Sequence, residues 1–234
     1  MSFSAPVRAR RAAAMVGVVG LLAAVAALAR PSASATAAAP ENGAGGLEEK
    51  PGPGPSAPSP SGSGRGRTAF DRQGMWIWYV SRSQGGSVAA IIAQARRAHI
   101  GTVYVKSGDG ATVWNQFNKS LIGPLHRAGI DVCAWQFVYG NEPVAEANVG
   151  AVAVHRGADC LVIDAEADYE GKYASADLYI RTLRAKIGAN FPLSLSGFPY
   201  VDYHPAFPYS VFLGPGGAQY NQPQMYWKAI ETSV

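Results

Sequence analysis

The first 69 residues lack almost everything that a folded core needs. Between Phe3 and Phe70 there is no aromatic residue, and from residue 36 to 69 the chain is mainly Pro, Gly, Ser and Ala. Such a segment buries too little apolar surface to offset the conformational entropy that folding removes. We therefore predict a disordered linker over 36–69 and one folded domain over 70–234, which is long enough for a single core.

Charge is missing from residues 12–29, which are rich in Ala, Val, Leu and Gly. Arginines precede this run, and the small residues Ala33-Ser34-Ala35 follow it. This order is typical of a secretory signal peptide, so we predict a signal over 1–35, cleavage after Ala35 and a secreted or cell-surface protein. The alternative is an uncleaved N-terminal membrane anchor, because about 18 apolar residues just span a bilayer. No other contact with a membrane is predicted.

The domain has no excess of positive charge, although the whole chain carries a net charge of +4. Seven of the 20 Lys and Arg but only three of the 16 Asp and Glu precede Phe70, so the charges of the domain balance. Nucleic-acid binding requires a basic face, and we predict no nucleic-acid partner. All aromatic residues except Phe3 lie in the domain. Neutral, aromatic-rich surfaces suit sugars, although most of these rings are expected in the core.

Cysteine is scarce and several cofactor motifs are absent. Cys133 and Cys160 are the only cysteines, and both fall near the starts of predicted neighbouring strands. A secreted protein permits a disulfide between them, while two buried free thiols remain the alternative. Cys and His show no metal-ligand spacing, and there is no G-x-G-x-x-G, Walker or G-x-S-x-G sequence. We therefore predict no metal, no cofactor and no serine nucleophile.

A strand–helix pattern repeats along the domain. Apolar runs begin at residues 75, 102, 131, 160, 193 and 223, and helical patterns cover 87–98, 112–128, 143–156 and 173–187, with a kink or break expected at Gly123-Pro124. Units of about 30 residues indicate βαβ repeats and a parallel sheet. A doubly wound sheet and a (β/α)8 barrel both fit. Because no Gly-rich phosphate loop follows the first strand, we predict an α/β fold of the (β/α)8 TIM-barrel type, truncated after a sixth strand at 223–227.

Two carboxylates end the fourth predicted strand. The apolar run from Cys160 to Ile163 is typical of a strand buried on both faces, and Asp164 and Glu166 follow it. Side chains alternate along a strand, so both carboxylates point to the same side, at the carboxyl end where barrel enzymes keep their chemistry. We predict Glu166 as the general acid, because it lies further out, and Asp164 as the stabiliser of developing positive charge. The alternative is a capping or salt-bridged pair.

Other strand ends place polar and aromatic side chains around the same mouth. The predicted substrate-binding residues are Trp78, Lys106, Asp109, Trp135, Gln136, Tyr139, Tyr200, Gln224 and Tyr226. For each aromatic residue the alternative is core packing, and for Lys106 it is an exposed strand end. His204, in a loop rich in Pro and Tyr, has no paired acid in sequence reach. Asp168 and Glu170 are expected to be solvated near the next helix.

The motif Leu161-Val162-Ile163-Asp164-Ala165-Glu166 resembles the glycoside hydrolase superfamily of (β/α) barrels, nearest the family 25 lysozyme type. The runs 134–139 and 224–227 are similar in style to the third and sixth strands of those barrels. The resemblance implies a barrel that cleaves peptidoglycan glycan chains with the Asp-x-Glu of its fourth strand. The chain departs from the family in one respect, because its first strand carries no acid.

We therefore expect a secreted glycoside hydrolase-like protein that cleaves a cell-wall or other polysaccharide by carboxylate acid/base chemistry. Its predicted partner is a polysaccharide or peptidoglycan. The alternatives are a non-catalytic carbohydrate or cell-wall binding barrel and a structural domain.

Overall fold

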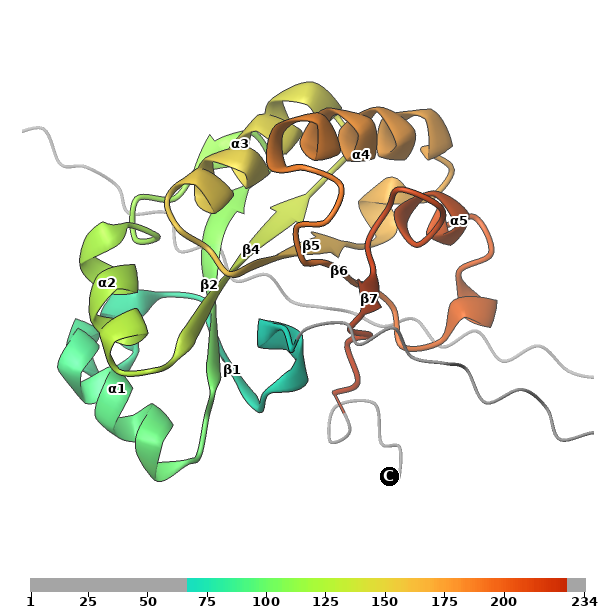
Figure 1. The fold of residues 1–234 in the computed structure, drawn as a ribbon. Helices are drawn as coiled ribbons and strands as arrows, with labels where there is room; N and C mark the ends of the chain where they lie inside the picture. Colours follow the sequence, from blue (N-terminus) through green and yellow to red (C-terminus); the bar gives the residue numbers. More distant parts are fainter. Residues whose placement is uncertain (1–66, 227–234) are drawn as a thin grey trace, which may run out of the picture. The chain divides into compact units, whose positions relative to one another are not determined.

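A computed structural model describes residues 67–226 (Figure 1). The strands are β1 Gly74–Ile77, β2 Thr102–Asp109, β3 Thr112–Val113, β4 Asp131–Val138, β5 Cys160–Ala165, β6 Leu193–Ser196 and β7 Tyr220–Asn221. The helices are α1 Val88–Arg97, α2 Lys119–Arg127, α3 Pro143–His155, α4 Tyr173–Ile187 and α5 Tyr209–Phe212. The predicted signal peptide and nearly all of the predicted linker lie outside the described residues. Within 67–226, no helix is long and apolar enough to cross a membrane.

Six strands form one parallel sheet in the order β1-β2-β4-β5-β6-β7, and the short β3 pairs antiparallel with β2. Because each strand pairs with the next parallel strand along the chain, right-handed crossovers place the connecting helices on one face. A doubly wound sheet would instead reverse its strand order partway. The sheet curls, with the helices α1 to α4 on its outer side (Figure 1). The fold is therefore α/β with a curled, half-barrel parallel sheet.

The two faces of the sheet have different compositions because side chains alternate along each strand. The convex face packs aliphatic side chains such as Val105, Ala134 and Ile163 against the helices in one large core. The concave face carries a smaller buried cluster of Tyr104, Cys133, Trp135, Cys160 and Val162, with Ala69 beneath it. Asp164 follows Val162 by two residues, so the same alternation directs its side chain to the concave side.

The two cysteines are joined by a disulfide. Cys133 on β4 and Cys160 on β5 lie directly opposite each other in the parallel register, with their Cα atoms 4.6 Å apart. The sequence allowed either a disulfide or two buried free thiols, and the structure has the disulfide. It links the middle strands of the sheet on the concave face.

Most predicted elements are confirmed, but the predicted helix over 112–128 is wrong in its first part. Thr112–Val113 forms β3, and the helix begins only at Lys119. The Asn118 side chain accepts hydrogen bonds from the backbone N–H groups of Ser120 and Leu121, which makes it the N-cap. Pro124 lies inside α2 without splitting it.

The sixth strand also lies earlier than predicted. It spans Tyr220–Asn221, whereas 223–226 has no strand and Trp227 lies outside the described residues. Pro223 has no N–H to donate to a strand ladder, which explains why regular pairing stops before it. Gln222 and Gln224 nevertheless donate backbone hydrogen bonds to the carbonyls of Leu195 and Gly197. This segment is therefore fixed beside the end of β6.

Candidate functional site

Asp164 and Glu166 converge on one amide at the carboxyl end of β5. Gln224 Nε2 donates to Asp164 Oδ1 at 2.8 Å and to Glu166 Oε1 at 2.9 Å. Asp164 is 8% exposed, while Glu166 is half-buried. The predicted convergence of the two side chains is thus present in the structure. Within the described chain, neither carboxylate forms an ion pair with a Lys, Arg or His side chain.

Burial and the neighbouring charge of Glu166 raise the pKa of Asp164 from 3.8 to about 7. The positive charge of Lys106 and the hydrogen bond from Gln224 act in the opposite direction but do not cancel the rise in pKa. A carboxyl group that holds a proton near neutral pH is suited to general acid chemistry.

Lys106 is buried, with 1% of its side chain exposed. The alternative prediction, an exposed lysine at a strand end, is therefore wrong. Its Nζ lies 4.1 Å from the ring centroid of Trp78, 4.7 Å from that of Trp114 and 4.8 Å from that of Trp135. It also forms an ion pair of 2.6 Å with Asp109. Three indole faces and one carboxylate thus stabilise this cation after its removal from water.

Asp109 links Lys106 to Tyr139. The Tyr139 hydroxyl donates to Asp109 Oδ1 at 2.8 Å, and this hydrogen bond to the carboxylate raises the pKa of Tyr139 to about 12. The predicted residues Lys106, Asp109 and Tyr139 therefore form one connected group at the carboxyl ends of β2 and β4. The charges of Lys106 and Asp109 both act on Asp164, which shows that the two groups share one electrostatic environment.

A cavity of about 360 Å³ lies against Asp164 and is walled largely by aromatic rings. Its aromatic lining consists of Trp76, Trp78, Trp135 and Tyr226. Trp76, Trp78 and Tyr226 are 45%, 53% and 61% exposed, so part of each side chain is accessible to a ligand, although Lys106 lies over the Trp78 ring and Tyr104 stacks on Trp76. Ser196, Gln222 and Gln224 contribute polar groups to the wall. An apolar cavity with a few polar groups and one carboxyl of raised pKa is the usual form of a binding site.

Of the predicted substrate-binding residues, four line this cavity: Trp78, Trp135, Gln224 and Tyr226. The others, Lys106, Asp109, Gln136, Tyr139 and Tyr200, are not part of its wall, and neither is Glu166. Gln136 points to the convex face, because it is adjacent to the inward-facing Trp135 on β4. Its amide is fully buried and donates to the carbonyls of Gly110 and Glu146. Tyr200 lies in the loop after β6, is 41% exposed, and packs beside Tyr203.

Sequence reasoning missed Trp76 and Gln222 among the residues that line the cavity. Trp76 lies on β1 and Trp78 directly follows the last residue of that strand, so alternation continued by one residue would have placed both rings on one face. Gln222 gave no comparable signal, because the predicted sixth strand began after it. The Gln222 amide donates to the Tyr104 hydroxyl at 3.3 Å.

His204 has an acidic partner that the sequence did not reveal. Its Nδ1 lies 2.7 Å from Glu170 Oε1, although the two residues are 34 positions apart. Phe198 stacks on the imidazole ring with centroids 3.3 Å apart. This pair joins the loop after β6 to the loop before α4. Glu170 is therefore paired, rather than simply solvated as predicted.

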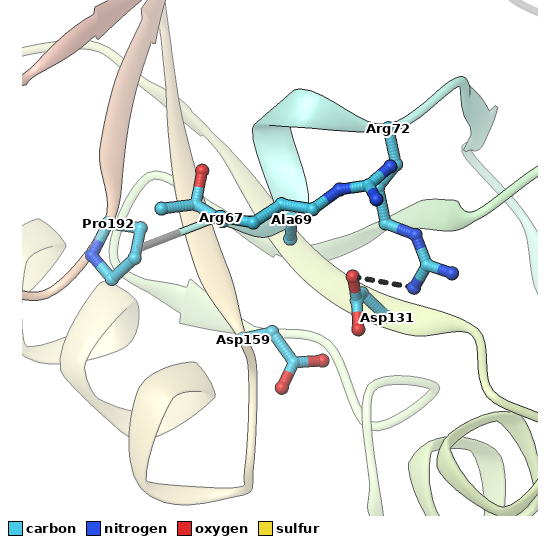
Figure 2. A pocket seen from close by; sticks show the side chains of 7 residues that line it. Arg67, Ala69, Arg72, Asp131, Asp159 and Pro192 are labelled. Atoms are coloured by element: carbon cyan, nitrogen blue, oxygen red, sulfur yellow. Dashed lines mark hydrogen bonds and ion pairs between the residues drawn. The ribbon is translucent and has the colours of Figure 1, made fainter. Parts of the chain in front are cut away.

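A second cavity, of about 500 Å³, lies at the opposite end of the sheet (Figure 2). Its wall is formed at the amino ends of β4, β5 and β6 by Asp131, Asp159 and Pro192. The segment before β1 contributes Arg67, Ala69 and Arg72. Both acids of this cavity already have a basic neighbour, since Arg72 contacts Asp131 at 2.9 Å and His126 contacts Asp159 at 2.7 Å. Ligands of parallel α/β sheets bind at the carboxyl ends of the strands. The cavity beside Asp164 is therefore the stronger candidate.

No protein-family model matches the chain, and no curated protein matches it. Among solved structures, the chain is similar to the catalytic domain of the endolysin ply40 from bacteriophage P40 of Listeria monocytogenes, with 14% identity, a TM-score of 0.40 and 49% of this chain covered. It is also similar to the modular Cpl-1 endolysin complexed with a peptidoglycan analogue, with 16% identity, a TM-score of 0.40 and 59% of this chain covered. The matches span 60% and 40% of those two chains. A TM-score of 0.40 is too low for either likeness to decide the function of this chain.

Within residues 67–226, no three His, Cys, Asp or Glu side chains are grouped closely enough to hold a metal ion.

Proposed function

We propose that this protein is a glycoside hydrolase-like enzyme that cleaves a polysaccharide by the acid/base chemistry of Asp164 and Glu166. The observation that carries the proposal is the pair itself. Two carboxyl groups share one neutral amide, at the carboxyl end of a buried parallel strand and beside an aromatic cavity. Glycosidic bond cleavage uses one protonated and one ionised carboxyl group.

The environment of the pair supports these two protonation states near neutral pH. Two like charges that lie close together in a partly buried site do not both ionise readily, so the pair retains a proton to a higher pH than an isolated carboxyl group. The protonated member would donate to the leaving oxygen, and the ionised member would stabilise positive charge at the anomeric carbon.

The two roles can be distributed in two ways. The sequence assigns Glu166 as the proton donor and Asp164 as the stabilising group. One observation favours the reverse, because Asp164 is the member whose pKa is raised to about 7 and it lines the cavity. The pH dependence of turnover separates the two assignments. If Asp164 is the donor, activity falls as pH rises through about 7, because the donor then loses its proton.

The aromatic rings of the cavity supply the sugar-binding part of the proposal. Trp76, Trp78 and Tyr226 expose ring faces against which the apolar faces of pyranose rings can stack. The resemblance of the 161–166 motif to family 25 lysozymes makes peptidoglycan the first substrate to test. The alternative function, a non-catalytic barrel that binds a cell-wall glycan, requires the same rings but not the carboxylates.

Two further parts of the proposal concern the rest of the chain. We place the protein outside the cytoplasm or at the cell surface, on the basis of the predicted signal over 1–35. The alternative is attachment to the membrane through that apolar segment. We also propose that the half-barrel is part of a (β/α)8 barrel, which agrees with its singly wound parallel order.

The decisive experiment measures reducing-sugar release from purified peptidoglycan and a panel of polysaccharides. It compares the full chain with Glu166→Gln, Asp164→Asn and the matched control Asp168→Asn, an exposed acid in the following turn. We expect turnover to fall about 10²- to 10⁴-fold in the first two variants and to stay unchanged in the control. Circular dichroism confirms that each variant is folded. Folded wild-type protein that binds one glycan but releases no sugar would overturn the enzyme proposal in favour of the binding barrel.

A further inference from the structure

Gln224 occupies an unusual place in the site, between two carboxyl groups. Its amide nitrogen carries two hydrogens, and the two acceptors within reach are Asp164 Oδ1 at 2.8 Å and Glu166 Oε1 at 2.9 Å. One hydrogen is therefore directed at each carboxyl group. Because both oxygens bind the same nitrogen, they lie no more than about 5.7 Å apart.

The backbone beneath this amide is itself held in place. The Gln224 N–H donates to the Gly197 carbonyl at 2.9 Å, and the Gln222 N–H donates to the Leu195 carbonyl at 2.8 Å. Pro223 lies between them and restricts the backbone further. The amide thus projects from a segment that is bonded to β6 and the residue after it, next to the strand that carries Asp164.

We propose that Gln224 is a positioning residue, which holds the carboxyl groups of Asp164 and Glu166 at one fixed spacing through the two hydrogens of its amide. Sequence reasoning assigned it to substrate binding. With both hydrogens committed to protein carboxyl groups, only its carbonyl oxygen remains for a ligand. The catalytic consequence of this positioning rests on the proposed function, whereas the positioning itself does not.

A neutral donor has a specific effect here. An N–H group that donates to a carboxylate stabilises the ionised form, and two such bonds counteract the burial and mutual repulsion that favour a proton on the pair. The charged groups that act on Asp164 are Glu166, Lys106 and Asp109, and the first and last oppose its ionisation. Gln224 therefore keeps two carboxyl groups close together without adding a charge that would neutralise either of them.

The test uses two variants of Gln224, one that removes the hydrogen-bond donor and one that makes it charged. In each, carboxyl ¹³C NMR titration of the full chain measures the pKa of Asp164. Gln224→Met keeps the length of the side chain but removes both hydrogens, so Asp164 should titrate about one pH unit higher. Gln224→Lys supplies a charged donor, so Asp164 should titrate at least about one unit lower. Gln222→Met, on the same segment but bonded to Tyr104, is the matched control and should leave the titration of Asp164 in place.

A kinetic readout then separates positioning from substrate binding. We expect Gln224→Met to lower kcat about tenfold with little change in KM, whereas loss of a substrate contact would raise KM. A titration of Asp164 that moves in the same direction in both Gln224 variants, or in neither, would overturn the proposal. If the opposite shifts occur but wild-type protein releases no sugar, the proposed enzyme function fails and the positioning role stands.

Discussion

The acids at the amino ends of β4 and β5 and the two acids at the carboxyl end of β5 have different partners. At the amino ends, Asp131 and Asp159 each have a basic partner, Arg72 at 2.9 Å and His126 at 2.7 Å. At the carboxyl end of β5, Asp164 and Glu166 share only the neutral amide of Gln224. A cation is present nearby, but Lys106 is paired with Asp109 instead.

This difference separates acids that have a basic partner from two acids whose shared partner is a neutral amide. Asp131 and Asp159 are each held by a basic side chain. At the carboxyl end of β5, burial and the charge of Glu166 raise the pKa of Asp164 to about 7, and the hydrogen bond from the neutral Gln224 amide opposes this rise without cancelling it. The larger cavity lies at the amino ends, yet the perturbed group lies at the smaller one.

The largest expected effect concerns the free energy of unfolding and its pH dependence. Between pH 3.8 and about 7, native Asp164 holds a proton that the unfolded chain has released. Its contribution to stability is thus fully present below pH 3.8 and is lost as pH rises to about 7, by an amount on the order of 4 kcal/mol. Asp164→Asn removes this loss. The difference in the free energy of unfolding between the variant and wild type, measured with urea, should therefore be more favourable to the variant at pH 8 than at pH 5. A constant difference between the two proteins at both pH values would contradict the raised pKa.

Lys106→Met tests how much the buried charge of Lys106, which is paired with Asp109, contributes to stability. The variant keeps the apolar stem among the three indoles but removes the charge, which leaves Asp109 without its ion partner. We expect a loss of about 3 kcal/mol in the free energy of unfolding, because an ion pair with one fully buried partner is broken. Asp164 should also titrate at higher pH, since the charge of Lys106 lowers its pKa.

Lys119→Met is the control for that experiment, because Lys119 is an exposed lysine at the start of α2. It should leave both unfolding and the titration of Asp164 within error. Equal stability of the two variants would show that the buried ion pair contributes nothing to the fold.

The smallest effect is expected at the amino ends. Arg72→Met removes the partner of Asp131 from a pair whose side chains are about one third exposed. Such pairs contribute about 0–1 kcal/mol, and the variant should unfold at nearly the wild-type urea concentration. Sugar release should be unchanged. A loss of activity in folded Arg72→Met would mean that the second cavity belongs to the functional site.

Much of the candidate site followed from local sequence. The apolar run 160–163 predicted a buried parallel strand, and alternation placed Asp164 and Glu166 on one side of it, as the structure has them. The predicted boundaries of α4 and the predicted start of β6 match the structure. Apolar spacing and Gly188 mark the helix clearly in the sequence. The roles of the individual site residues stay predictions until they are tested.

Contacts between distant segments could not be predicted in this way. The ion pair of Lys106 with Asp109 is local, but its enclosure by Trp78, Trp114 and Trp135 requires three separate parts of the chain. The partner of His204 lies on another loop, and a lone histidine gives no indication of it. Trp135 and Gln136 are adjacent on β4 and were both predicted at the mouth of the barrel, and the packing of Trp135 shows which of the two side chains points to the concave side.

The sequence by itself determined the repeating strand–helix order, the neutral and aromatic-rich domain, and the position of the two acids at a strand end. These features depend on hydrophobic periodicity and on alternation, which act over a few residues. Only the tertiary structure decided that the cysteines are bonded, that Lys106 is buried, and that Gln224 joins the two acids. Those outcomes depend on which distant side chains meet when the sheet curls, and on how burial and neighbouring charges then change the protonation of a carboxyl group.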